Sequence, residues 1–464
     1  MSDPILLVGA ASNPESLISN PVLPMVLIGL VLIITFGFIA FDWLHKTVAA
    51  LVGAVVAVVL ALILNVYGGD DPYLAVHEFL HHDLGVLGVI VGTSIIVAIA
   101  SDSGLFHFIA IKLLKLTGGD PERQLTAVII ATVIFVTFLT IAPGVLIMTS
   151  LVLVITQELN QNPKPYILAV AIGANSGALM TFASGIPTLM IGTSAQIPYL
   201  HFLIVSMPLG ILSAILALWV IRRFYRSALL TDSNVEDRAA KVAAFNEWAL
   251  VKDRRLFYRS AMILALTILG FAFAQQLGVG LDFIAITGGA VALMFSGLTP
   301  EEAISKVKWT IIIFFVGLFV LIGTVRETGL LDVLASQIYL LSGGSDLTAM
   351  LLIVPFVFFT AGIVDNIPVA ATMIPVIKNM IAQGLQAEPL WWSLIAACNL
   401  GGNPTPIGSI GAVIALHALE KERGIVIGWG EYLKIGGVIT ALQIILVLVY
   451  MSGFWYFDLF PTLG

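Results

Sequence analysis

The sequence has one cysteine and few charged residues. Cys398 is alone among 464 residues, which excludes internal disulfides and cysteine-built metal clusters. Charged side chains make up 11% of the chain, against roughly 25% in an ordinary soluble domain. The first twenty residues lack a basic region and an A-x-A site, so we expect no cleaved signal peptide. A phosphate loop of the G-x-x-x-x-G-K-S/T type is also missing, which argues against direct use of ATP by this chain.

Apolar residues are abundant instead and make up 59% of the chain. Long stretches carry no Asp, Glu, Lys or Arg, and most are close to the ~20 residues that one bilayer crossing needs. Two of them, residues 124–157 and 165–221, are too long for one helix and must fold back or cross twice. The sequence therefore predicts an all-α membrane protein with about ten transmembrane helices.

Short motifs recur in the chain at a fixed offset of 225 residues. The matched segments are Ser101-Asp102-Ser103-Gly104-Leu105 with Arg326-Glu327-Thr328-Gly329-Leu330, Gly118-Gly119 with Gly343-Gly344, and Thr140-Ile141-Ala142-Pro143 with Asp365-Asn366-Ile367-Pro368. Two such copies, each interrupted by Gly, Pro, Asn and Thr within apolar stretches, are typical of secondary transporters with a binding site near the bilayer midplane.

Lysine and arginine are unevenly distributed among the loops. If the loops that carry Lys46, residues 112–123, Lys164, residues 222–259, residues 306–308 and residues 421–434 are cytoplasmic, only Arg326 and Lys378 fall on the far side, which is a strong positive-inside bias. The N-terminus then lies outside, and five crossings precede and five follow the central loop, so the two repeats have inverted topology. We expect a multi-pass protein of the cell (inner) membrane whose basic central loop is a solvated cytoplasmic linker.

These features divide the chain into five parts. They are an extracytoplasmic N-terminal segment (1–20), a first repeat (21–221), the cytoplasmic linker (222–259), a second repeat (260–457) and a C-terminal tail (458–464). Each repeat is expected to contain a re-entrant hairpin, at about 124–157 and 347–380, because a proline-containing break falls near the middle of a long apolar stretch. An unwound helix should follow each hairpin, at about 175–188 and 399–409.

One hairpin tip and one unwound helix form each half of the expected binding site. Glycines free the backbone and prolines remove hydrogen bonds, which leaves carbonyl groups for a small cation and helix N-termini for an anion. The alternative for the glycines is close packing of helices. The candidate residues are Thr140, Asn175, Gly177, Thr181 and Ser184 in the first copy, and Asp365, Asn366, Pro368, Asn399, Gly401, Gly402, Asn403 and Thr405 in the second.

Asp365 is the most informative side chain, because an unpaired carboxylate at membrane depth costs roughly 2.5–3.5 kcal/mol. Bound Na⁺, with Asn366 and Asn403 nearby, a proton, or hydrogen bonds from Asn366 and the hairpin backbone could compensate its charge. The structural alternative is that Asp365 caps the half-helix that follows it. Asp102 and Glu327 are each expected to cap the next helix, and a role in gating or ion access is their alternative.

The segment His77-Glu78-Phe79-Leu80-His81 satisfies the zinc-protease pattern H-E-x-x-H. It lies in an outside loop, and no downstream L-D-G or N-x-x-D-G segment supplies a third metal ligand. Because short motifs match by chance, we predict that the chain is not an enzyme and needs no cofactor beyond Na⁺ or H⁺ as a coupling ion.

Four segments of the chain resemble the ion transporter superfamily, in the branch of the arsenite permeases, NhaD-type antiporters and P protein, with citrate and divalent-anion/sodium transporters as relatives. They are Phe41 to Leu51, similar to F-E-x-x-H-R-T-x-A-A-L, Ser103 to Phe106, similar to T-G-L-F, Asp365 to Met373, similar to D-N-V-P-x-x-A-T-M, and Ala397 to Gly408, similar to L-G-G-N-x-T-x-I-G. The resemblance implies the inverted repeat with two hairpins, often a homodimer, and ion-coupled movement of an inorganic or carboxylate anion or of Na⁺. It assigns binding to Asp365, Asn366, Asn399, Asn403 and Thr405, and to Asn175, Gly177 and Thr181.

The first hairpin departs from the branch pattern, because Thr140-Ile141 stands where D-N is usual. One acidic half-site is therefore missing. The leading hypothesis is a secondary active transporter for a small anion, coupled to Na⁺ or H⁺, in which one repeat moves relative to the other. A Na⁺/H⁺ antiporter that uses Asp365 as the exchanged carboxylate is the alternative, and a channel is a third. The expected partners are the lipid bilayer, a small inorganic or carboxylate ion and a second copy of the chain, with no nucleic acid.

Overall fold

The computed structural model describes residues 22–67, 71–82, 84–182, 184–229, 235–307 and 309–463, and these form helices and turns without a strand. The N-terminal segment 1–20 and residues 230–234 of the linker lie outside the described residues. The helices before the linker are α2 (Val22–Ala40), α3 (Lys46–Ile63), α4 (Pro72–His82), α5 (Leu84–Asp102), α6 (Leu105–Lys115), α7 (Pro121–Leu139), α8 (Ile141–Glu158), α9 (Lys164–Ala178), α10 (Ile186–Ser194), α11 (Tyr199–Ile204) and α12 (Ser206–Phe224). The later helices are α13 (Arg226–Leu229), α14 (Val235–Ala244), α15 (Arg254–Ala272), α16 (Ala274–Leu277), α17 (Leu281–Ser296), α18 (Pro300–Lys306), α19 (Trp309–Glu327), α20 (Leu330–Ser342), α21 (Asp346–Val364), α22 (Asn366–Ala382), α23 (Ala387–Leu400), α24 (Ile410–Arg423) and α25 (Trp429–Tyr456).

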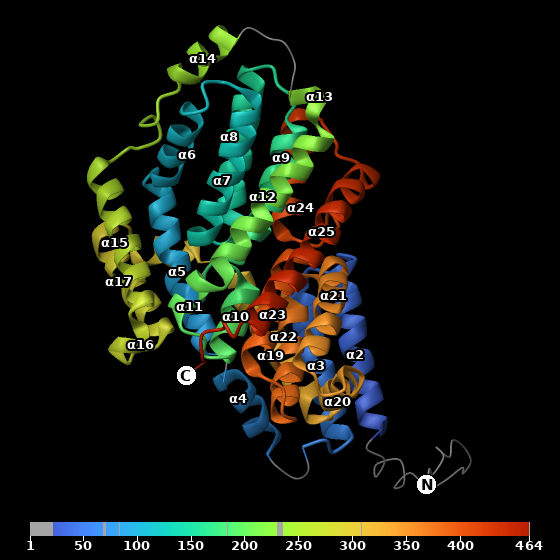
Figure 1. Cartoon of the computed structure of the whole chain (residues 1–464). Helices are drawn as coiled ribbons and strands as arrows, with labels where there is room; N and C mark the ends of the chain where they lie inside the picture. The colour runs from blue at the N-terminus through green and yellow to red at the C-terminus, as the bar shows by residue number, and fades with distance from the viewer. Residues whose placement is uncertain are drawn as a thin grey trace.

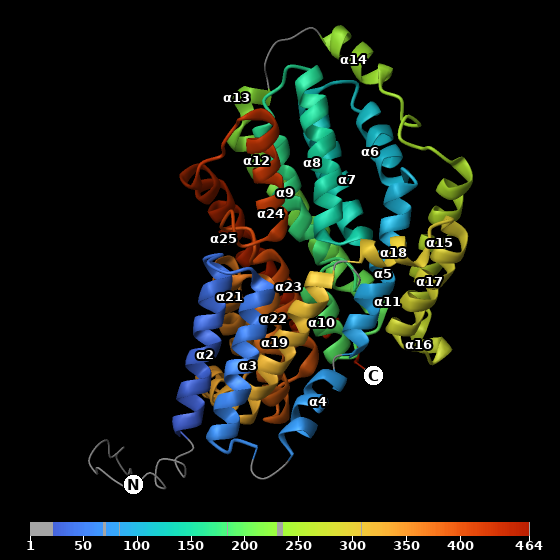
Figure 2. The same ribbon diagram turned by 180° about the vertical axis from the view of Figure 1, so that it is seen from behind.

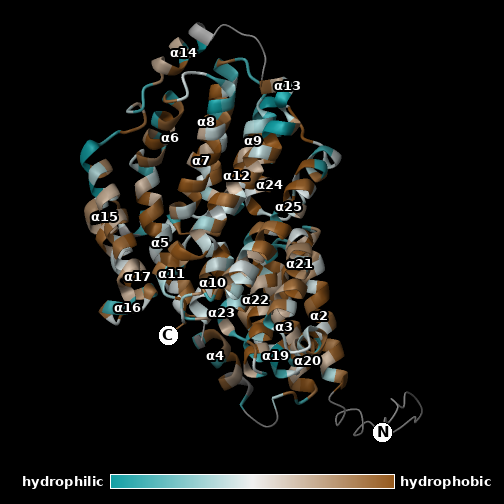
Figure 3. Cartoon of the chain, viewed as in Figure 1, coloured by the Kyte–Doolittle hydropathy of each residue, from teal (hydrophilic) through white to brown (hydrophobic). Residues whose placement is uncertain are grey.

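Ten helices of the described part of the chain are long and apolar enough to cross a membrane. Three of them, α7, α8 and α21, are also arms of the two helical hairpins, and that these hairpins are re-entrant stays a prediction. Apolar residues cover most of α2, α3, α15 and α17, whereas polar residues gather around α13 and the start of α15 (Figure 3). Outward side chains such as Ile33 and Met294 are 67% and 73% exposed, which is unfavourable in water and favourable against lipid. The all-α membrane fold predicted from the sequence is confirmed.

The 225-residue offset of the sequence motifs extends to whole helices. Four consecutive helices of the first half, α5 to α8, begin at residues 84, 105, 121 and 141. Their counterparts α19 to α22 begin at residues 309, 330, 346 and 366. The two sets of helices therefore keep the same order and spacing over four elements.

The two hairpins lie in opposite halves of the molecule (Figures 1 and 2). Helices α7 and α8 occupy the upper half with their tip pointing down to the middle, and α21 and α22 occupy the lower half with their tip pointing up to the middle. The tip residues Thr140 and Asp365 adopt positive φ angles of 71° and 133° at equivalent positions of the two copies. Such angles cost about 1–3 kcal/mol in a residue other than glycine, and they concentrate at functional sites.

The two halves of the chain also pack directly on each other. Helix α5 of the first half runs against α17 of the second, and α3 runs against α19. At Gly92 the backbones of α5 and α17 come so close that a Cβ atom would lie 2.2 Å from the carbonyl of Ala285. The absence of a side chain at Gly92 is therefore what permits this contact between the halves.

The central linker is largely exposed, but it is docked on the first half. Trp248 packs on Phe108 of α6 with ring centroids 4.6 Å apart, and Val242 is buried. The Lys115 ammonium donates a hydrogen bond of 2.6 Å to Glu247, which lowers the pKa of that carboxyl. In Figure 1, α14 lies at the end of the molecule opposite to the start of α2.

Candidate functional site

A cavity of about 320 Å³ lies between the two hairpin tips. The first tip contributes Thr140 and Ile141, and the second contributes Asn366 and Ile367. Helix α5 supplies the hydroxyl-bearing residues of one wall, namely Thr93, Ser94 and Ser101. The volume is at the lower end of the roughly 300–1,000 Å³ of small-molecule sites, so a small ligand fits. Of the predicted site residues, Thr140 and Asn366 line this cavity.

Four helices begin at the wall of this cavity. The residues that line it include the first residues of α8, α10, α22 and α24, which are Ile141, Ile186, Asn366 and Ile410. Backbone N–H groups in the first turn of a helix have no partner within the helix, and the helix dipole makes this end positive. Four such ends around one cavity form an environment that favours an anion.

The helix ends of the two copies are capped differently. Asp365 caps α22 by accepting a hydrogen bond of 3.3 Å from the N–H of Ile367, and Ser409 caps α24 by accepting one of 3.1 Å from the N–H of Gly411. In the first copy no side chain caps α8 or α10. Thr140, which stands where the branch pattern has an acid, therefore leaves the N-terminus of α8 open toward the cavity.

Asp365 has a partner that the sequence reasoning missed. Its carboxylate lies 3.7 Å from the ammonium of Lys46, and the two side chains are 13% and 25% exposed. Lys46 begins α3, where the positive helix end disfavours a cation. The carboxylate of Asp365 therefore stabilises the charge of Lys46, just as Lys46 stabilises the charge of Asp365. Asp365 thus caps its half-helix, as the structural alternative predicted, and its charge is balanced within the protein. The proposed Na⁺ ligands Asp365, Asn366 and Asn403 stay a prediction, with no recorded contact between the side chains of Asp365 and Asn403 in the described part of the chain.

Asn175 and Asn403 meet in a buried polar network that joins the halves of the chain. The Nδ2 of Asn175 donates to the Oδ1 of Asn403 at 2.8 Å, and the Oδ1 of Asn175 accepts from the hydroxyl of Ser409 at 2.9 Å. The Nδ2 of Asn403 donates to Gln443 of α25 at 2.8 Å, and Gln443 donates to Ser213 of α12 at 2.7 Å. All five side chains are at most 1% exposed. Gln443 was not predicted, although a glutamine within the apolar helix α25 is a signal that could have found it.

Asn399 belongs to a second buried contact between the copies. Its Nδ2 donates at 2.8 Å to the hydroxyl of Thr188 in α10, while its Oδ1 is buried without a recorded hydrogen bond. This oxygen faces Gly185, where a Cβ atom would lie 2.7 Å from it.

The break between α9 and α10 is held by two hydroxyl groups. Ser184 donates to the carbonyl of Ala178 at 2.7 Å, and Thr181 donates to the carbonyl of Thr137 in the first hairpin at 2.9 Å.

The remaining candidates hold the broken helices against the hairpins. Thr405 lies in the segment between α23 and α24, and its hydroxyl donates to the carbonyl of Gly362 near the second tip at 2.6 Å. Pro368 is buried in the first turn of α22. Gly177 and Gly401 allow close approach, because a Cβ atom would lie 2.7 Å from the carbonyl of Val133 at one and 3.0 Å from Phe358 at the other. At Gly402 a Cβ atom would lie 2.7 Å from the carbonyl of Gly408. Close packing is thus the role that the structure records for these three glycines.

Two expectations about charged residues change with the structure. Asp102 and Glu327 do not cap the helices that follow them, because α6 and α20 begin after Gly104 and Gly329 without a side-chain cap. The glycines adopt left-handed conformations and occupy the N-cap positions themselves. Asp102 instead pairs with Lys306, and Glu327 with Arg326.

The H-E-x-x-H segment lies on α4, where its central residue has a packing role. Phe79 is 6% exposed and fills the space beside Gly323 of α19, and the guanidinium of Arg326 lies 5.6 Å from its ring. The rings of His77 and His81 stack on each other. Within the described ranges no three His, Cys, Asp or Glu residues gather as a metal site would require.

We expect the buried network to be a major determinant of stability, which replacing Asn403 with Ala tests. The change leaves the Nδ2 of Asn175 and the Oε1 of Gln443 without partners. Each buried polar group without a partner costs about 1–3 kcal/mol, so the free energy of unfolding should fall by about 2–6 kcal/mol. Melting temperatures in detergent measure the effect. Ser393→Ala is the matched control, because Ser393 is also fully buried but has no recorded hydrogen bond, and equal shifts for the two variants would contradict the prediction.

The described part of the chain has ten apolar candidate spans, and broken helices surround a cavity between its two hairpin tips. These features together define a membrane transporter. The model of the citrate transporter family matches residues 30–397 and 278–460, and the chain belongs to this family. A transporter of Mycobacterium tuberculosis is 29% identical over 429 residues, which cover 91% of this chain and 96% of the relative. The mouse P protein is 24% identical over 501 residues, covering 90% of this chain and 58% of that protein. The predicted resemblance to the ion transporter superfamily is thereby confirmed.

The fold has a counterpart among solved structures. The antimetabolite efflux pump MtrF of Neisseria gonorrhoeae superposes with a TM-score of 0.59 at 13% identity, covering 91% of this chain and 97% of that protein. At this identity the likeness concerns the fold alone.

Proposed function

We propose that the protein is a secondary active transporter that carries a small inorganic oxyanion or carboxylate, coupled to Na⁺ or H⁺, through the cavity between its hairpin tips. The observation that carries the proposal is the convergence of four helix N-termini on one cavity. Two of them, at α8 and α10, have no side-chain cap and so keep N–H groups for a ligand. A substrate anion would supply there the negative charge that Asp365 supplies at α22.

The citrate transporter family match supports a carboxylate among the candidate substrates. A membrane site suits this chemistry without buried arginine, because backbone dipoles can solvate an anion where a free charge would be costly. The cytoplasmic placement of the basic linker, an outside N-terminus and a homodimer stay predictions of the same proposal.

Uptake into proteoliposomes tests the proposal. The purified protein is reconstituted and offered radiolabelled citrate, succinate and phosphate, with an imposed Na⁺ gradient, an imposed pH gradient, or none. We expect the Na⁺ gradient or the pH gradient to drive concentrative uptake of at least one of these anions. The transported anion should also raise the melting temperature, because a ligand that binds only the folded state stabilises it by mass action. Uptake of none of the three anions by the wild type would contradict the proposal, and fast flux without a gradient would favour a channel.

The second candidate function is Na⁺/H⁺ exchange at Asp365. The observation that favours it is the partly buried pair of Asp365 and Lys46, because a bound Na⁺ could displace the ammonium from the carboxylate. Exchange of Na⁺ for H⁺ in the same proteoliposomes, without uptake of any anion, would favour this function over the first.

A further inference from the structure

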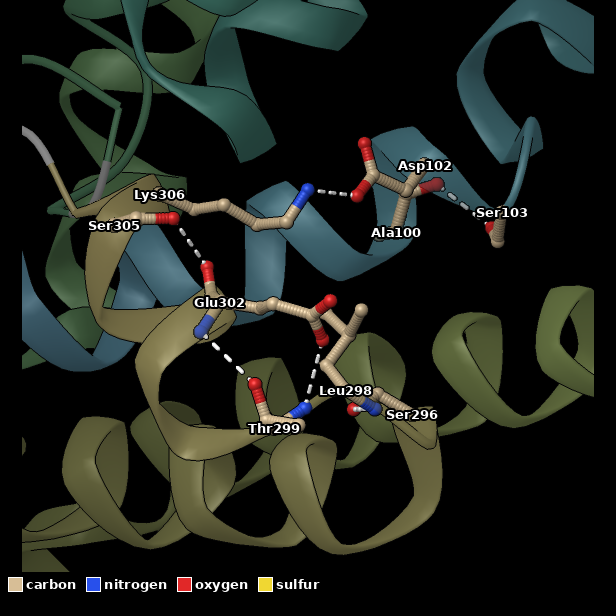
Figure 4. Close-up of polar contacts among 9 residues, drawn as sticks. All are labelled: Ala100, Asp102, Ser103, Ser296, Leu298, Thr299, Glu302, Ser305 and Lys306. Atoms are coloured by element: carbon tan, nitrogen blue, oxygen red, sulfur yellow. Dashed lines mark hydrogen bonds and ion pairs between the residues drawn. The ribbon is translucent and has the colours of Figure 1, made fainter.

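The cavity between the tips has an ion pair at its exposed edge, with one member from each half of the chain. Asp102 ends α5, and Lys306 ends α18, the short helix between α17 and α19. The ammonium of Lys306 contacts the carboxylate of Asp102 (Figure 4). Both residues line the cavity. Their side chains are 30% and 49% exposed, so water reaches the pair.

No other charged side chain competes for this position within the described lining of the cavity. Glu302 lies one turn before Lys306 on α18, yet its carboxylate is turned to the start of the helix, where it accepts a hydrogen bond of 2.9 Å from the N–H of Thr299 (Figure 4). The hydroxyl of Thr299 accepts in return from the N–H of Glu302, which completes a capping box. Lys306 is thus the single basic side chain facing the cavity among these residues.

The placement of the two charges on their helices differs. Lys306 in the last turn of α18 is favoured by the helix dipole, whereas Asp102 in the last turn of α5 is disfavoured by it. A neighbouring opposite charge is therefore more important for stabilising Asp102 than for stabilising Lys306. Water screens an ion pair at this exposure, so its ammonium can exchange partners at little cost.

We propose that Lys306 recruits the substrate anion at the entrance of the cavity and that Asp102 holds Lys306 when no anion is there. The ammonium leaves Asp102 for the arriving carboxylate or oxyanion and returns to it after the anion has moved to the helix N-termini, which closes the entrance again. This inference rests on the proposed anion transport and adds the residue that selects for negative charge.

Two variants that break the same ion pair test the proposal, because recruitment predicts opposite effects. Lys306→Gln removes the charge that meets the anion, so the KM for citrate, succinate or phosphate uptake should rise about tenfold, as expected for loss of one charge-assisted hydrogen bond. Asp102→Asn removes only the competitor, so KM should stay or fall. Lys306→Arg should keep KM within about threefold of the wild type, because the charge remains.

Lys164→Gln is the matched control. It breaks the ion pair between Lys164 and Glu431, which spans 2.7 Å, has side chains 25% and 33% exposed, and lies outside the lining of the cavity. Its KM should equal that of the wild type, and melting temperatures establish that every variant is folded. If Lys306→Gln and Asp102→Asn raise KM alike, the pair only fastens α18 to α5 and the recruiting role is wrong. If the wild type takes up none of the three anions, the proposed anion transport itself is wrong. Failure of the recruiting role and failure of the proposed function therefore give different results.

Discussion

Replacing Thr140 with Asp should abolish anion transport while leaving the protein folded. The N-terminus of α8 is uncapped and faces the cavity, whereas Asp365 caps α22 at the equivalent position of the second copy. An introduced carboxylate would take the N–H groups that we assign to the substrate and would repel it. Two like charges 4 Å apart repel by roughly 4 kcal/mol at an effective dielectric constant of 20, so transport should fall more than 100-fold.

The variant is expected to fold because the equivalent position of the second copy is already an aspartate, Asp365, which also has a positive φ, of 133°. Thr140→Asn is the control, since it can cap α8 as aspartate does but carries no charge, so it should reduce anion uptake far less than Thr140→Asp. Uptake of the anion identified in proteoliposomes measures both. A fully active Thr140→Asp variant would show that the anion does not bind at α8, and Na⁺ exchange enhanced by the new acid would favour the antiporter instead.

The pair of Lys46 and Asp365 gives the second large effect, and it distinguishes the two candidate functions. For an anion transporter, the pair anchors the second hairpin tip to the start of α3, so Lys46→Met and Asp365→Asn should each reduce uptake at least tenfold. The double variant should be no worse than either single one, because the interaction is already lost. For a partly buried pair we expect a coupling energy of about 1–3 kcal/mol in a double-mutant cycle on stability.

An antiporter predicts a different pattern for the same three proteins. Asp365→Asn must then lose all Na⁺/H⁺ exchange, whereas Lys46→Met keeps exchange because the carboxylate remains. Parallel measurement of Na⁺-dependent and pH-dependent flux decides between the two. Additive losses in the double variant would contradict the anchoring role that we assign to the pair.

The sequence was most informative where the chain breaks its own regularity. The positive φ angles of Thr140 and Asp365 fall at the breaks expected in the two hairpins, because a proline three residues on and a polar residue within apolar stretches both oppose a continuous helix. Asn175 and Asn403 were both candidates for one site, and the structure joins them directly. Repetition at 225 residues relates Thr140 to Asp365, whereas Asn175 and Asn403 are 228 residues apart and were candidates because each lies in the broken segment that follows a hairpin.

The partners of these residues could not be derived in the same way. Lys46 follows the first span and reads as a topology signal, and nothing in its spacing places it beside a hairpin tip far along the chain. Asp102 and Lys306 come from different repeats and meet because α17 and α18 both pack on α5. Such pairs depend on tertiary packing, which periodicity and local motifs do not encode. The capping predicted for Asp102 failed for a local reason, because the left-handed Gly104 starts the next helix without it.

The hydrogen bond between Asn175 and Asn403 limits how the protein can move. A cycle in which one repeat swings away from the other would strand several buried amide and hydroxyl groups at every turnover, at about 1–3 kcal/mol each. A moving body that keeps both broken helices together avoids this loss. The part that carries cargo across the bilayer would then be a composite drawn from both ancestral copies, and the boundary between mobile and stationary parts would cut through each repeat instead of running between them.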